Sequence, residues 1–314
     1  MILTVTLNPA LDRIMFIKEF VSGNANRIYR RENCIGGKGA HVSVNLADLG
    51  VASTATGIAM GPNGRVFMDA LLAAGVACDF DTPDGGDTRT NYIIVEDNGI
   101  CSQVCEKGPT LTPEILDAYL VHFEKLAKEA EYIVIAGDAS NYTGSKGSSF
   151  QMDLLRIGRD AGANVILDAN GMSLREGVTC TPFLIKPNMQ ELNQLTDMPT
   201  DTDGEIIAAI QSLDKYNLPM VAASRGGEGS IVRCFDHYYK VGVADVKMQN
   251  EVGCGDAYMA GLLCGLKNCV PNDVLLTFAA ACGGSMAENP LTVGLNAARA
   301  RELQATVPIE ELHV

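Results

Sequence analysis

Apolar and polar residues alternate in five short runs in the first third of the chain. These runs span residues 2–7, 13–17, 28–34, 89–96 and 100–105. Alternation with β-branched side chains predicts strands, and the polar faces after the first run predict surfaces open to solvent. The last two runs flank Asp97-Asn98-Gly99, residue types that favour a hairpin turn. We therefore expect a small antiparallel lid attached to a larger body.

Elsewhere the chain alternates continuous apolar runs with helical patterns. Apolar strands are expected at 54–59, 132–136, 164–168, 183–186 and 220–224. Helices are expected at 63–74, 113–129, 150–161 and 204–216, with a further helical pattern after Gly39 that stops at Gly50. Apolar strands separated by amphipathic helices are typical of a parallel sheet that is covered on both faces. The pattern thus predicts an α/β fold.

Composition and charge restrict the partners of this body. The 314 residues are 47% hydrophobic and 20% charged, as in ordinary globular proteins, and the formal net charge is −14. A field of this sign repels polyanions, so we expect neither nucleic acid nor an anionic membrane as a partner. A small phosphorylated substrate remains compatible, because a local basic patch dominates at short range.

The cysteines and the N-terminus indicate a cytoplasmic protein. The ten cysteines are scattered without a Cys-x-x-Cys pair, which predicts free thiols in a reducing compartment. The four histidines show no metal-ligand spacing. The first residues lack the charged and apolar regions of a signal peptide, and no run of about 18 apolar residues predicts a membrane span.

A glycine-rich segment, Gly253-Cys254-Gly255, precedes Asp256 and an apolar helix. Glycine lets the backbone approach a ligand closely, and the unpaired amides of a helix start attract phosphate. One interpretation makes Asp256 a base that deprotonates an attacking hydroxyl beside that phosphoryl group. The other interpretation makes it an ordinary helix N-cap. Spacing alone favours neither.

A second candidate is the strand end Lys186-Pro-Asn188-Met-Gln-Glu191. Asn188 and Glu191 are three residues apart and share one face of a helix. The spacing fits a capping box, and it also fits a pair that orients Mg²⁺ through water. Both roles can hold together.

Two further glycine-rich segments each fit either a ligand-binding role or a purely structural one. Ser224-Arg225-Gly226-Gly227-Glu228-Gly229 follows a strand, where it is either a ligand-binding loop or a plain turn between strands. Gly36-Gly37-Lys38-Gly39 follows three arginines. Glycine amides and a lysine ammonium suit an anionic ligand, whereas solvated surface charge is the ordinary explanation. The chain has no P-loop, dinucleotide-fingerprint or nucleophile-elbow motif.

Four segments together resemble the ribokinase-like sugar kinases. They are Thr6-Leu-Asn-Pro-Ala-Leu-Asp12, Gly36-Gly-Lys-Gly39, Lys186-Pro-Asn-Met-Gln-Glu191-Leu and Val252-Gly-Cys-Gly-Asp256. The resemblance is strongest to the phosphofructokinase B branch, which holds 1-phosphofructokinase and tagatose-6-phosphate kinase, and it runs from Leu3 to about Gly294. It implies one domain over residues 1–314, a three-layer sandwich whose mainly parallel sheet carries a β lid from roughly 11–35 and 88–106. It also implies a homodimer formed through this lid.

The resemblance implies a role for each matching residue, with ATP and Mg²⁺ as cofactors. The implied catalytic group is Asp256, with an anion hole from Gly253, Cys254 and Gly255. The implied sugar-phosphate contacts are Asp12, Gly37, Lys38, His41, Arg89, Asn91 and Asp138. The implied ATP contacts are Lys186, Asn188, Ser224, Gly226, Gly227, Gly229, Gly284 and Asn289. The implied Mg²⁺ contacts are Glu191 and Asn188, through water.

Three positions depart from the family's usual motifs. His41 replaces an asparagine that follows the glycine stretch, Asp138 stands in a strand-end Gly-Ser-Leu-Pro motif, and Arg225 replaces a leucine. The implied reaction transfers the ATP γ-phosphate to a ketohexose phosphate. Thr88-Arg-Thr-Asn91 favours fructose 1-phosphate, with tagatose 6-phosphate and fructose 6-phosphate as alternatives.

The sequence is also compatible with other functions. Asp138 favours an unphosphorylated sugar or a nucleoside, whereas Lys38 and Arg89 favour a phosphorylated one. A non-catalytic ligand-binding regulator is a further alternative, which the retained Asp256 and its glycines disfavour. A dehydrogenase is a remote one.

Overall fold

The computed structural model describes residues 1–137 and 147–314. In this part of the chain a ten-stranded sheet forms the centre, in the order β14-β13-β12-β11-β10-β9-β8-β1-β4-β5. The seven strands from β11 to β5 in this order are parallel, and β12, β13 and β14 continue the sheet antiparallel. Their bounds are β1 Ile2–Thr6, β4 Ser53–Ile58, β5 Ala77–Asp81, β8 Tyr132–Ala136, β9 Asn164–Asp168, β10 Leu184–Ile185, β11 Met220–Ser224, β12 Ser230–Cys234, β13 His237–Val241 and β14 Ile309–Leu312.

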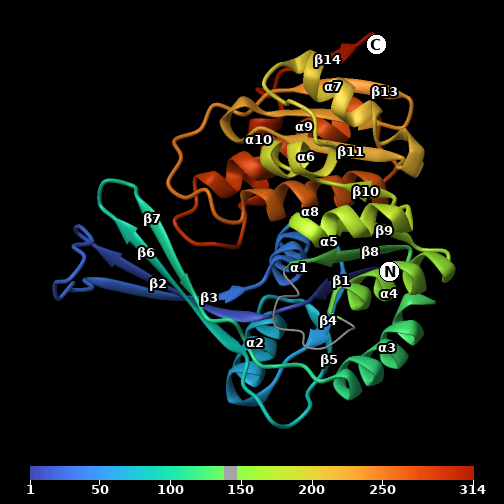
Figure 1. The fold of residues 1–314 in the computed structure, drawn as a ribbon. Helices are drawn as coiled ribbons and strands as arrows, with labels where there is room; N and C mark the ends of the chain where they lie inside the picture. Colours follow the sequence, from blue (N-terminus) through green and yellow to red (C-terminus); the bar gives the residue numbers. More distant parts are fainter. Residues whose placement is uncertain (138–146) are drawn as a thin grey trace.

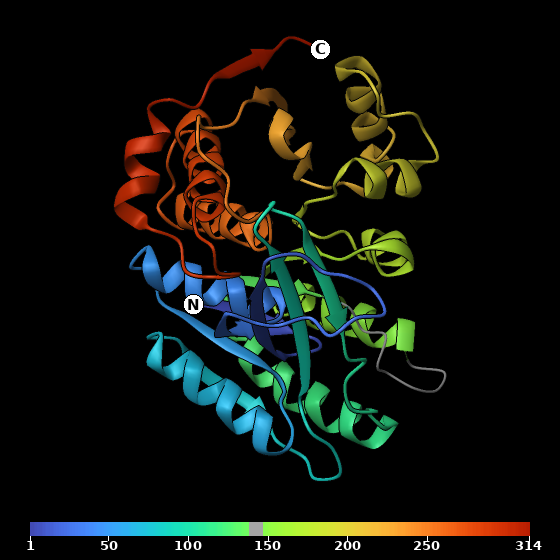
Figure 2. The ribbon, with the colours of Figure 1, turned by 90° about the vertical axis from the view of Figure 1, so that its left-hand side faces the viewer.

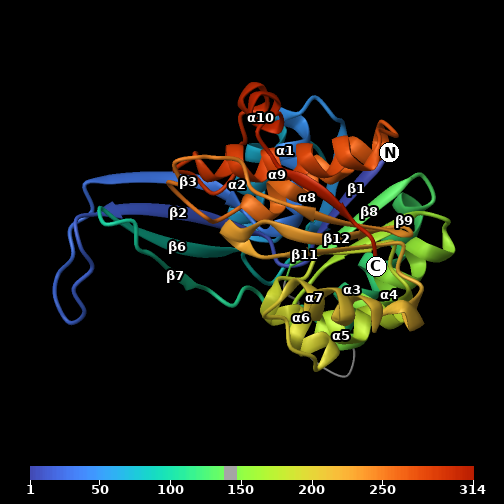
Figure 3. The ribbon, with the colours of Figure 1, turned by 90° about the horizontal axis from the view of Figure 1, so that it is seen from above.

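Helices cover both faces of the sheet, as the view from above shows (Figure 3). One layer contains α1 Lys38–Asp48, α2 Gly61–Ala73, α8 Cys254–Lys267, α9 Asn272–Ala287 and α10 Ala297–Gln304. The opposite layer contains α3 Pro113–Ala127, α4 Gly147–Asp160, α5 Gly171–Gly177, α6 Met189–Thr196 and α7 Asp203–Gln211. The layer of α3 to α7 packs its apolar side chains in one buried cluster, whereas the other layer has two, one with α1, α8, α9 and α10 and a smaller one with α1 and α2. The predicted α/β three-layer fold is confirmed.

A second sheet projects from one side of the body (Figure 1) and faces the viewer in Figure 2. Its order is β3-β2-β6-β7, with bounds β2 Ala10–Ile17, β3 Arg30–Gly36, β6 Arg89–Glu96 and β7 Cys101–Cys105. We call these four strands the lid sheet. Its small core contains Ile14, Phe16 and Ile93. The expectation of a wholly antiparallel lid is wrong, because the central strands β2 and β6 pair in parallel. Each begins a hairpin that leaves the body in the same direction.

The expected helix at 204–216 is also shorter in the structure. Helix α7 ends at Gln211, and a separate 3-10 turn, η2, follows at Asp214–Tyr216. Asn217 then adopts a positive φ of 50°, which ends the turn. Among the described residues, no helix is both long enough and apolar enough to span a membrane, and all ten cysteines are free.

Candidate active site

The candidate site lies where the central parallel strands end. Asn8 follows β1, Asp168 ends β9, Lys186 follows β10 and Ser224 ends β11. The carboxyl ends of parallel strands form the usual ligand-binding edge of an open α/β sheet. Helix α8 begins beside this edge with the residue before it, Gly253, as its N-cap.

The start of α8 depends on its glycines. Gly253 has a φ of 85°, and a Cβ at this position would lie 2.1 Å from the carbonyl oxygen of Thr292. Gly255 lies in the first turn, where an added Cβ would be 3.2 Å from Nζ of Lys186. The amide end of α8 therefore faces a lysine ammonium, which is a suitable arrangement for an anion.

Asp256 occupies the third position of α8 and is 7% exposed. The N-cap interpretation is wrong, since Gly253 is the cap and makes no side-chain capping bond. Instead, Oδ2 of Asp256 lies 2.9 Å from Nδ1 of His41 on α1. The other ring nitrogen of His41 lies 2.8 Å from the carbonyl oxygen of Ile35 at the end of β3.

Asp12 links the body to the lid sheet. Its Oδ1 accepts a hydrogen bond from Asn91 Nδ2 at 2.8 Å, and its Oδ2 accepts one from Thr292 at 3.4 Å. His41 Nε2 lies 3.9 Å from the same Oδ2. Burial raises the pKa of Asp12, although the charge of His41 opposes the rise. The predicted sugar-binding residues Asp12, His41 and Asn91 thus meet beside the predicted base.

Lys38 and Lys186 converge on Asp168, a residue that the sequence reasoning missed. Nζ of Lys38 lies 2.9 Å from one carboxylate oxygen of Asp168, and Nζ of Lys186 lies 3.5 Å from the other. Burial alone would raise the pKa of Asp168, but the charges of Lys186 and Lys38 hold it below the ordinary value. The charge of Asp168 in turn raises the pKa of Lys38. An acidic residue that ends a buried strand was the available sequence signal.

Arg89 lies at the base of the lid sheet. Its guanidinium donates to the carbonyl oxygens of Glu106 and Asn8, at 3.1 and 3.2 Å. It lines a hollow of about 520 Å³ together with Lys107 and Gly108. Gly37 lies close to Asn8, whose carbonyl accepts from Arg89. Its φ is 107°, and an added Cβ would lie 2.7 Å from Thr6, so the position requires glycine.

The three arginines before the glycine stretch are all exposed. Arg30 pairs with Glu32 at 2.9 Å and lies over the ring of Phe16 on the lid sheet. β3 begins at Arg30 and reaches the body only at Gly36. Arg30 is therefore a solvated surface charge, whereas the Lys38 side chain lies at the candidate site.

Asn188 and Glu191 form a complete capping box at the start of α6. Asn188 Oδ1 accepts from the Glu191 amide, and Glu191 Oε2 accepts from the Asn188 amide, both at 2.9 Å. The capping interpretation is confirmed. An isolated parallel bridge pairs Asn188 with Ser224, so the two predicted ATP-binding segments lie side by side.

A groove of about 520 Å³ runs along these two segments. It is lined by residues of both, namely Asn188, Met189, Gln190, Thr200, Asp201, Ser224, Arg225, Gly226 and Glu228. Arg225 is held at the groove by ion pairs with Asp203 at 2.7 Å and Glu228 at 2.5 Å. A Cβ on Gly227 would meet open space, whereas one on Gly229 would lie 2.0 Å from the Val241 carbonyl. Gly229 therefore serves the β11–β12 connection itself.

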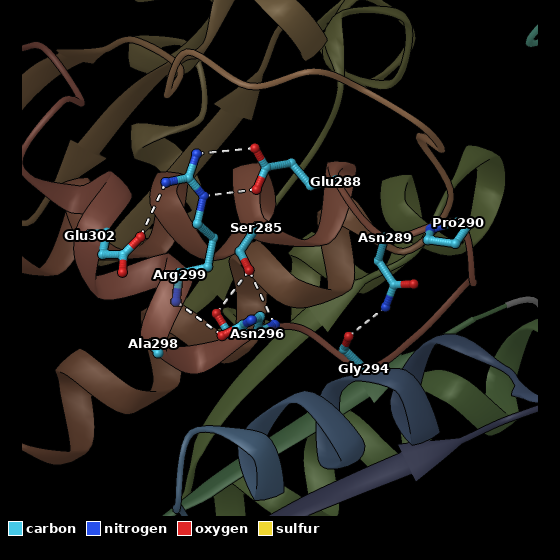
Figure 4. Close-up of a pocket in the computed structure, with 9 residues that line it drawn as sticks. All are labelled: Ser285, Glu288, Asn289, Pro290, Gly294, Asn296, Ala298, Arg299 and Glu302. Atoms are coloured by element: carbon cyan, nitrogen blue, oxygen red, sulfur yellow. Dashed lines mark hydrogen bonds and ion pairs between the residues drawn. The ribbon is translucent and has the colours of Figure 1, made fainter.

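The remaining predicted ATP-binding residues lie elsewhere. Asn289 lines a separate pocket beside α9 and α10, where its amide points to the carbonyl of Gly294 at 2.6 Å (Figure 4). Arg299 crosses the same pocket between Glu288 and Glu302. A Cβ on Gly284 would contact Ala244 at 3.2 Å, so this glycine packs α9 against the chain before α8. Asp138 lies outside the described residues.

Five buried polar atoms near the site lack a hydrogen-bond partner within the described structure. They are the oxygens Thr6 Oγ1, Asn8 Oδ1 and Asn91 Oδ1, and two charged residues of the site, Arg89 and Asp168, add the atoms Nε and Oδ2. Buried polar groups are normally paired, so such atoms indicate a place where a polar ligand completes the network. The sequence reasoning included Thr6 and Asn8 in a motif without giving either a role.

Comparison with known proteins finds relatives in both sequence and fold. The model of the pfkB family carbohydrate kinases matches residues 5–296. A tagatose-6-phosphate kinase from Staphylococcus epidermidis is 29% identical, over 99% of this chain and 100% of the relative. The structure of phosphofructokinase-2 from Escherichia coli in complex with potassium has a TM-score of 0.88 at 22% identity, covering 97% of this chain and 98% of the other. A Thermotoga maritima structure described as a possible 1-phosphofructokinase has the same TM-score and identity, with 99% coverage of both chains.

The fold and the family match define a carbohydrate kinase, an enzyme that transfers a phosphoryl group to an alcohol. Within that class, the chain belongs to the pfkB family.

Proposed function

We propose that this kinase transfers the γ-phosphate of ATP to a hydroxyl of a ketohexose phosphate, with Asp256 as the base. The observation that carries the proposal is the position of Asp256 in the first turn of α8, next to amides that face Lys186. Phosphoryl transfer depends mainly on positioning and charge stabilisation. This turn combines an anion site with a carboxylate that can accept the hydroxyl proton, a contribution typically worth about 10²–10⁴-fold.

The phosphoryl donor occupies the groove between Asn188 and Ser224 in this proposal. Its polar lining and its open glycines suit a nucleotide whose phosphates run toward α8. Lys186 lies where these phosphates reach the helix start. Lys38 shares Asp168 with Lys186, so we place its ammonium beside the transferred phosphoryl group.

The sugar lies between the lid sheet and the end of β1. Asp12 and Asn91 hold its hydroxyls, and the unpaired oxygens of Thr6 and Asn8 accept further hydroxyl donors. Arg89 and the neighbouring hollow with Lys107 hold the phosphate that the sugar already carries. Closure of the lid sheet over the sugar excludes water as a competing acceptor.

Mg²⁺ fits this site as an ion carried mainly by the nucleotide. No group of three or more His, Cys, Asp or Glu side chains in residues 1–137 and 147–314 is arranged to hold a metal alone. Asp168, Asp256 and Glu191 all act electrostatically on Lys38, so hard oxygen groups surround the phosphoryl position. Glu191 and Asn188 orient the waters of an ion that binds few protein ligands. Such an ion neutralises phosphate charge.

Fructose 1-phosphate is our first choice of acceptor. The Thr88-Arg-Thr-Asn91 segment supports it, while the Staphylococcus epidermidis relative, a tagatose-6-phosphate kinase, supports tagatose 6-phosphate as the second choice. Fructose 6-phosphate follows. The phosphate-binding arrangement around Arg89 favours all three over an unphosphorylated sugar.

The test is an ADP-release assay with Mg-ATP on fructose 1-phosphate, tagatose 6-phosphate, fructose 6-phosphate, fructose and ribose. Wild type is compared with Asp256→Asn and with the control Asp160→Asn, which alters an exposed residue at the end of α4. We expect turnover of one phosphorylated ketose, reduced about 10²–10⁴-fold by Asp256→Asn alone. Turnover only on fructose or ribose would overturn the phosphorylated acceptor, and full activity of Asp256→Asn would overturn the base.

We also propose a cytoplasmic homodimer that associates through the lid sheet. Several apolar side chains of this sheet and its loops are exposed, including Tyr29 at 63% and Val104 at 59%. A second copy that covers them would also support the sheet against which the sugar binds. The ten free cysteines suit a reducing compartment.

A further inference from the structure

His41 is buried between two carboxylates of the candidate site. The residue is 5% exposed and lies in the first turn of α1. Its Nε2 is 2.8 Å from the Ile35 carbonyl oxygen, and its Nδ1 is 2.9 Å from Oδ2 of Asp256. A carbonyl oxygen can only accept, so the contact with Ile35 requires a proton on Nε2.

That requirement restricts the contact with Asp256. With Nε2 protonated, a neutral His41 has only a lone pair on Nδ1, and this lone pair would face the lone pairs of an ionised Asp256. The contact is attractive when one further proton lies between the two groups. An ionised Asp256, which a base must be, therefore needs His41 as an imidazolium that donates from Nδ1.

The surrounding charges favour the imidazolium. Asp12 of β2 lies 3.9 Å from Nε2, while the cations Lys38 of α1 and Arg89 of β6 act on Asp256 and Asp12 respectively. Burial lowers the pKa of His41, but the hydrogen bond and charge of Asp256, followed by the charge of Asp12, raise it above the ordinary value. Two carboxylates thus hold one cation.

We propose that His41 is a positioning residue for Asp256, a role that rests on the proposed function above. The imidazolium fixes Oδ2 of Asp256 and leaves Oδ1 for the sugar hydroxyl. In the transfer step the hydroxyl proton moves to Asp256 while the hydroxyl oxygen bonds to the γ-phosphorus. The bond from that phosphorus to the bridging oxygen of ATP breaks, its electron pair leaves with ADP, and His41 keeps its own protons. His41 thereby replaces the neutral amide that the family's usual asparagine offers at this position.

The proposal makes the reaction sensitive to alkaline pH. Because the pKa of His41 is raised, the imidazolium is present below that pKa and is lost as pH rises through it. Nδ1 then stops donating, and Asp256 loses its anchor. We expect kcat to fall on the alkaline side in wild type. An amide does not titrate, so His41→Asn keeps a donor for Asp256 and removes this decline. His41→Ala removes the donor and lowers kcat about 10–100-fold below the pKa of His41, with little change in KM. The difference from wild type shrinks as pH rises through that pKa, because wild type then loses the same donor.

The first measurement uses the protein without substrates. Long-range proton–nitrogen NMR of the imidazoles across pH, with His41→Asn to assign the signal, reports the protonation of His41. We expect the imidazolium in wild type to persist above the ordinary histidine pKa, because Asp256 and Asp12 raise the pKa of His41, and we expect a lower pKa of His41 in Asp256→Asn. A His41 signal that titrates at the ordinary histidine pKa, unchanged by Asp256→Asn, would overturn the proposal.

The second measurement is the pH profile of kcat and KM for wild type, His41→Asn and His41→Ala, with circular dichroism to confirm folding. Loss of the alkaline decline in His41→Asn supports the proposal, and identical profiles of wild type and folded His41→Ala contradict it. Absence of turnover on every sugar would defeat the proposed function while the NMR titration still decides the His41–Asp256 contact.

Discussion

Asp168 is a single side chain that holds two cations at the end of β9. It is 3% exposed and carries a charge, and a buried charge is stable only when it is paired. Its partners approach from different directions, Lys38 from the start of α1 and Lys186 from the position after β10, the strand beside β9. The pairing therefore stabilises the fold and sets the positions of both ammonium groups.

We predict that Asp168→Asn lowers the free energy of unfolding by about 3 kcal/mol at pH 7, because Lys186 stays buried without its counterion. The depressed pKa of Asp168 makes this contribution present above the unfolded pKa of about 3.9 and lost as pH falls through the lower folded pKa. Urea unfolding at pH 7 and at lower pH measures it. The difference from wild type should shrink in acid.

Asp160→Asn is the matched control, since Asp160 pairs with Arg159 in solvent. Its free energy of unfolding should change by less than about 0.5 kcal/mol. A penalty for Asp168→Asn no larger than that of Asp160→Asn would show that the lysines do not depend on Asp168.

An individual candidate site residue could be recognised from the sequence where it belonged to a local motif. Asp256 stands behind two glycines, and Asn188 begins a capping spacing, so both were recognisable. Asp168 ends a strand without any such neighbour, and its importance arises from lysines 130 and 18 residues away in the chain. The contact between His41 and Asp256 spans 215 residues and was equally invisible to local pattern.

Helices α6 and α7 begin with the same device, which allows an internal comparison. Asn188 with Glu191 and Thr202 with Glu205 both form complete capping boxes. Only the first capping box, at the start of α6, contains residues of the candidate site. A variant in each box separates the contribution to helix stability from any contribution to phosphate binding.

We predict that Asn188→Ala and Thr202→Ala each lower the free energy of unfolding by about 1 kcal/mol. Asn188→Ala should in addition lower kcat/KM for Mg-ATP about 10-fold or more, because the Glu191 carboxylate loses its fixed place beside the phosphates. Thr202→Ala should leave kcat/KM within about twofold. Chemical denaturation and steady-state kinetics provide both numbers. Equal kinetic effects would assign Asn188 a structural role only.

At the level of elements, most of the parallel strands and many of the covering helices were predictable, because burial on two faces leaves long apolar runs. The parallel edge strand β5 and the helices α5, α9 and α10 were not expected. The sequence reasoning did not foresee β12, β13 and β14, which extend the sheet antiparallel. It also assigned the lid strands an antiparallel order throughout. Pairing direction depends on how a hairpin leaves the body, and local alternation is identical in both directions.

For the whole molecule, the lid sheet provides the proposed contact between subunits. We predict that Val104→Asp on β7 converts a dimer to monomers, because a charge at a buried apolar contact is costly. Val121→Asp on α3 is the control, since Val121 is 61% exposed and Val104 is 59% exposed. Light scattering at working concentration measures the molar mass of wild type and of both variants. A monomeric wild type, or dimers of both variants, would refute association through β7.

The central place of β1 has a consequence for synthesis on the ribosome. β1 lies between β4 and β8, whose pairing residues begin at Ser53 and Tyr132. At about 5–20 residues per second, its second partner emerges several seconds or more after β1 itself. During that interval the apolar segment Ile2–Thr6 has one open edge. Nascent chains of this protein are therefore expected to engage holding chaperones until β8 has left the exit tunnel, and slower translation before residue 132 would lengthen that exposure.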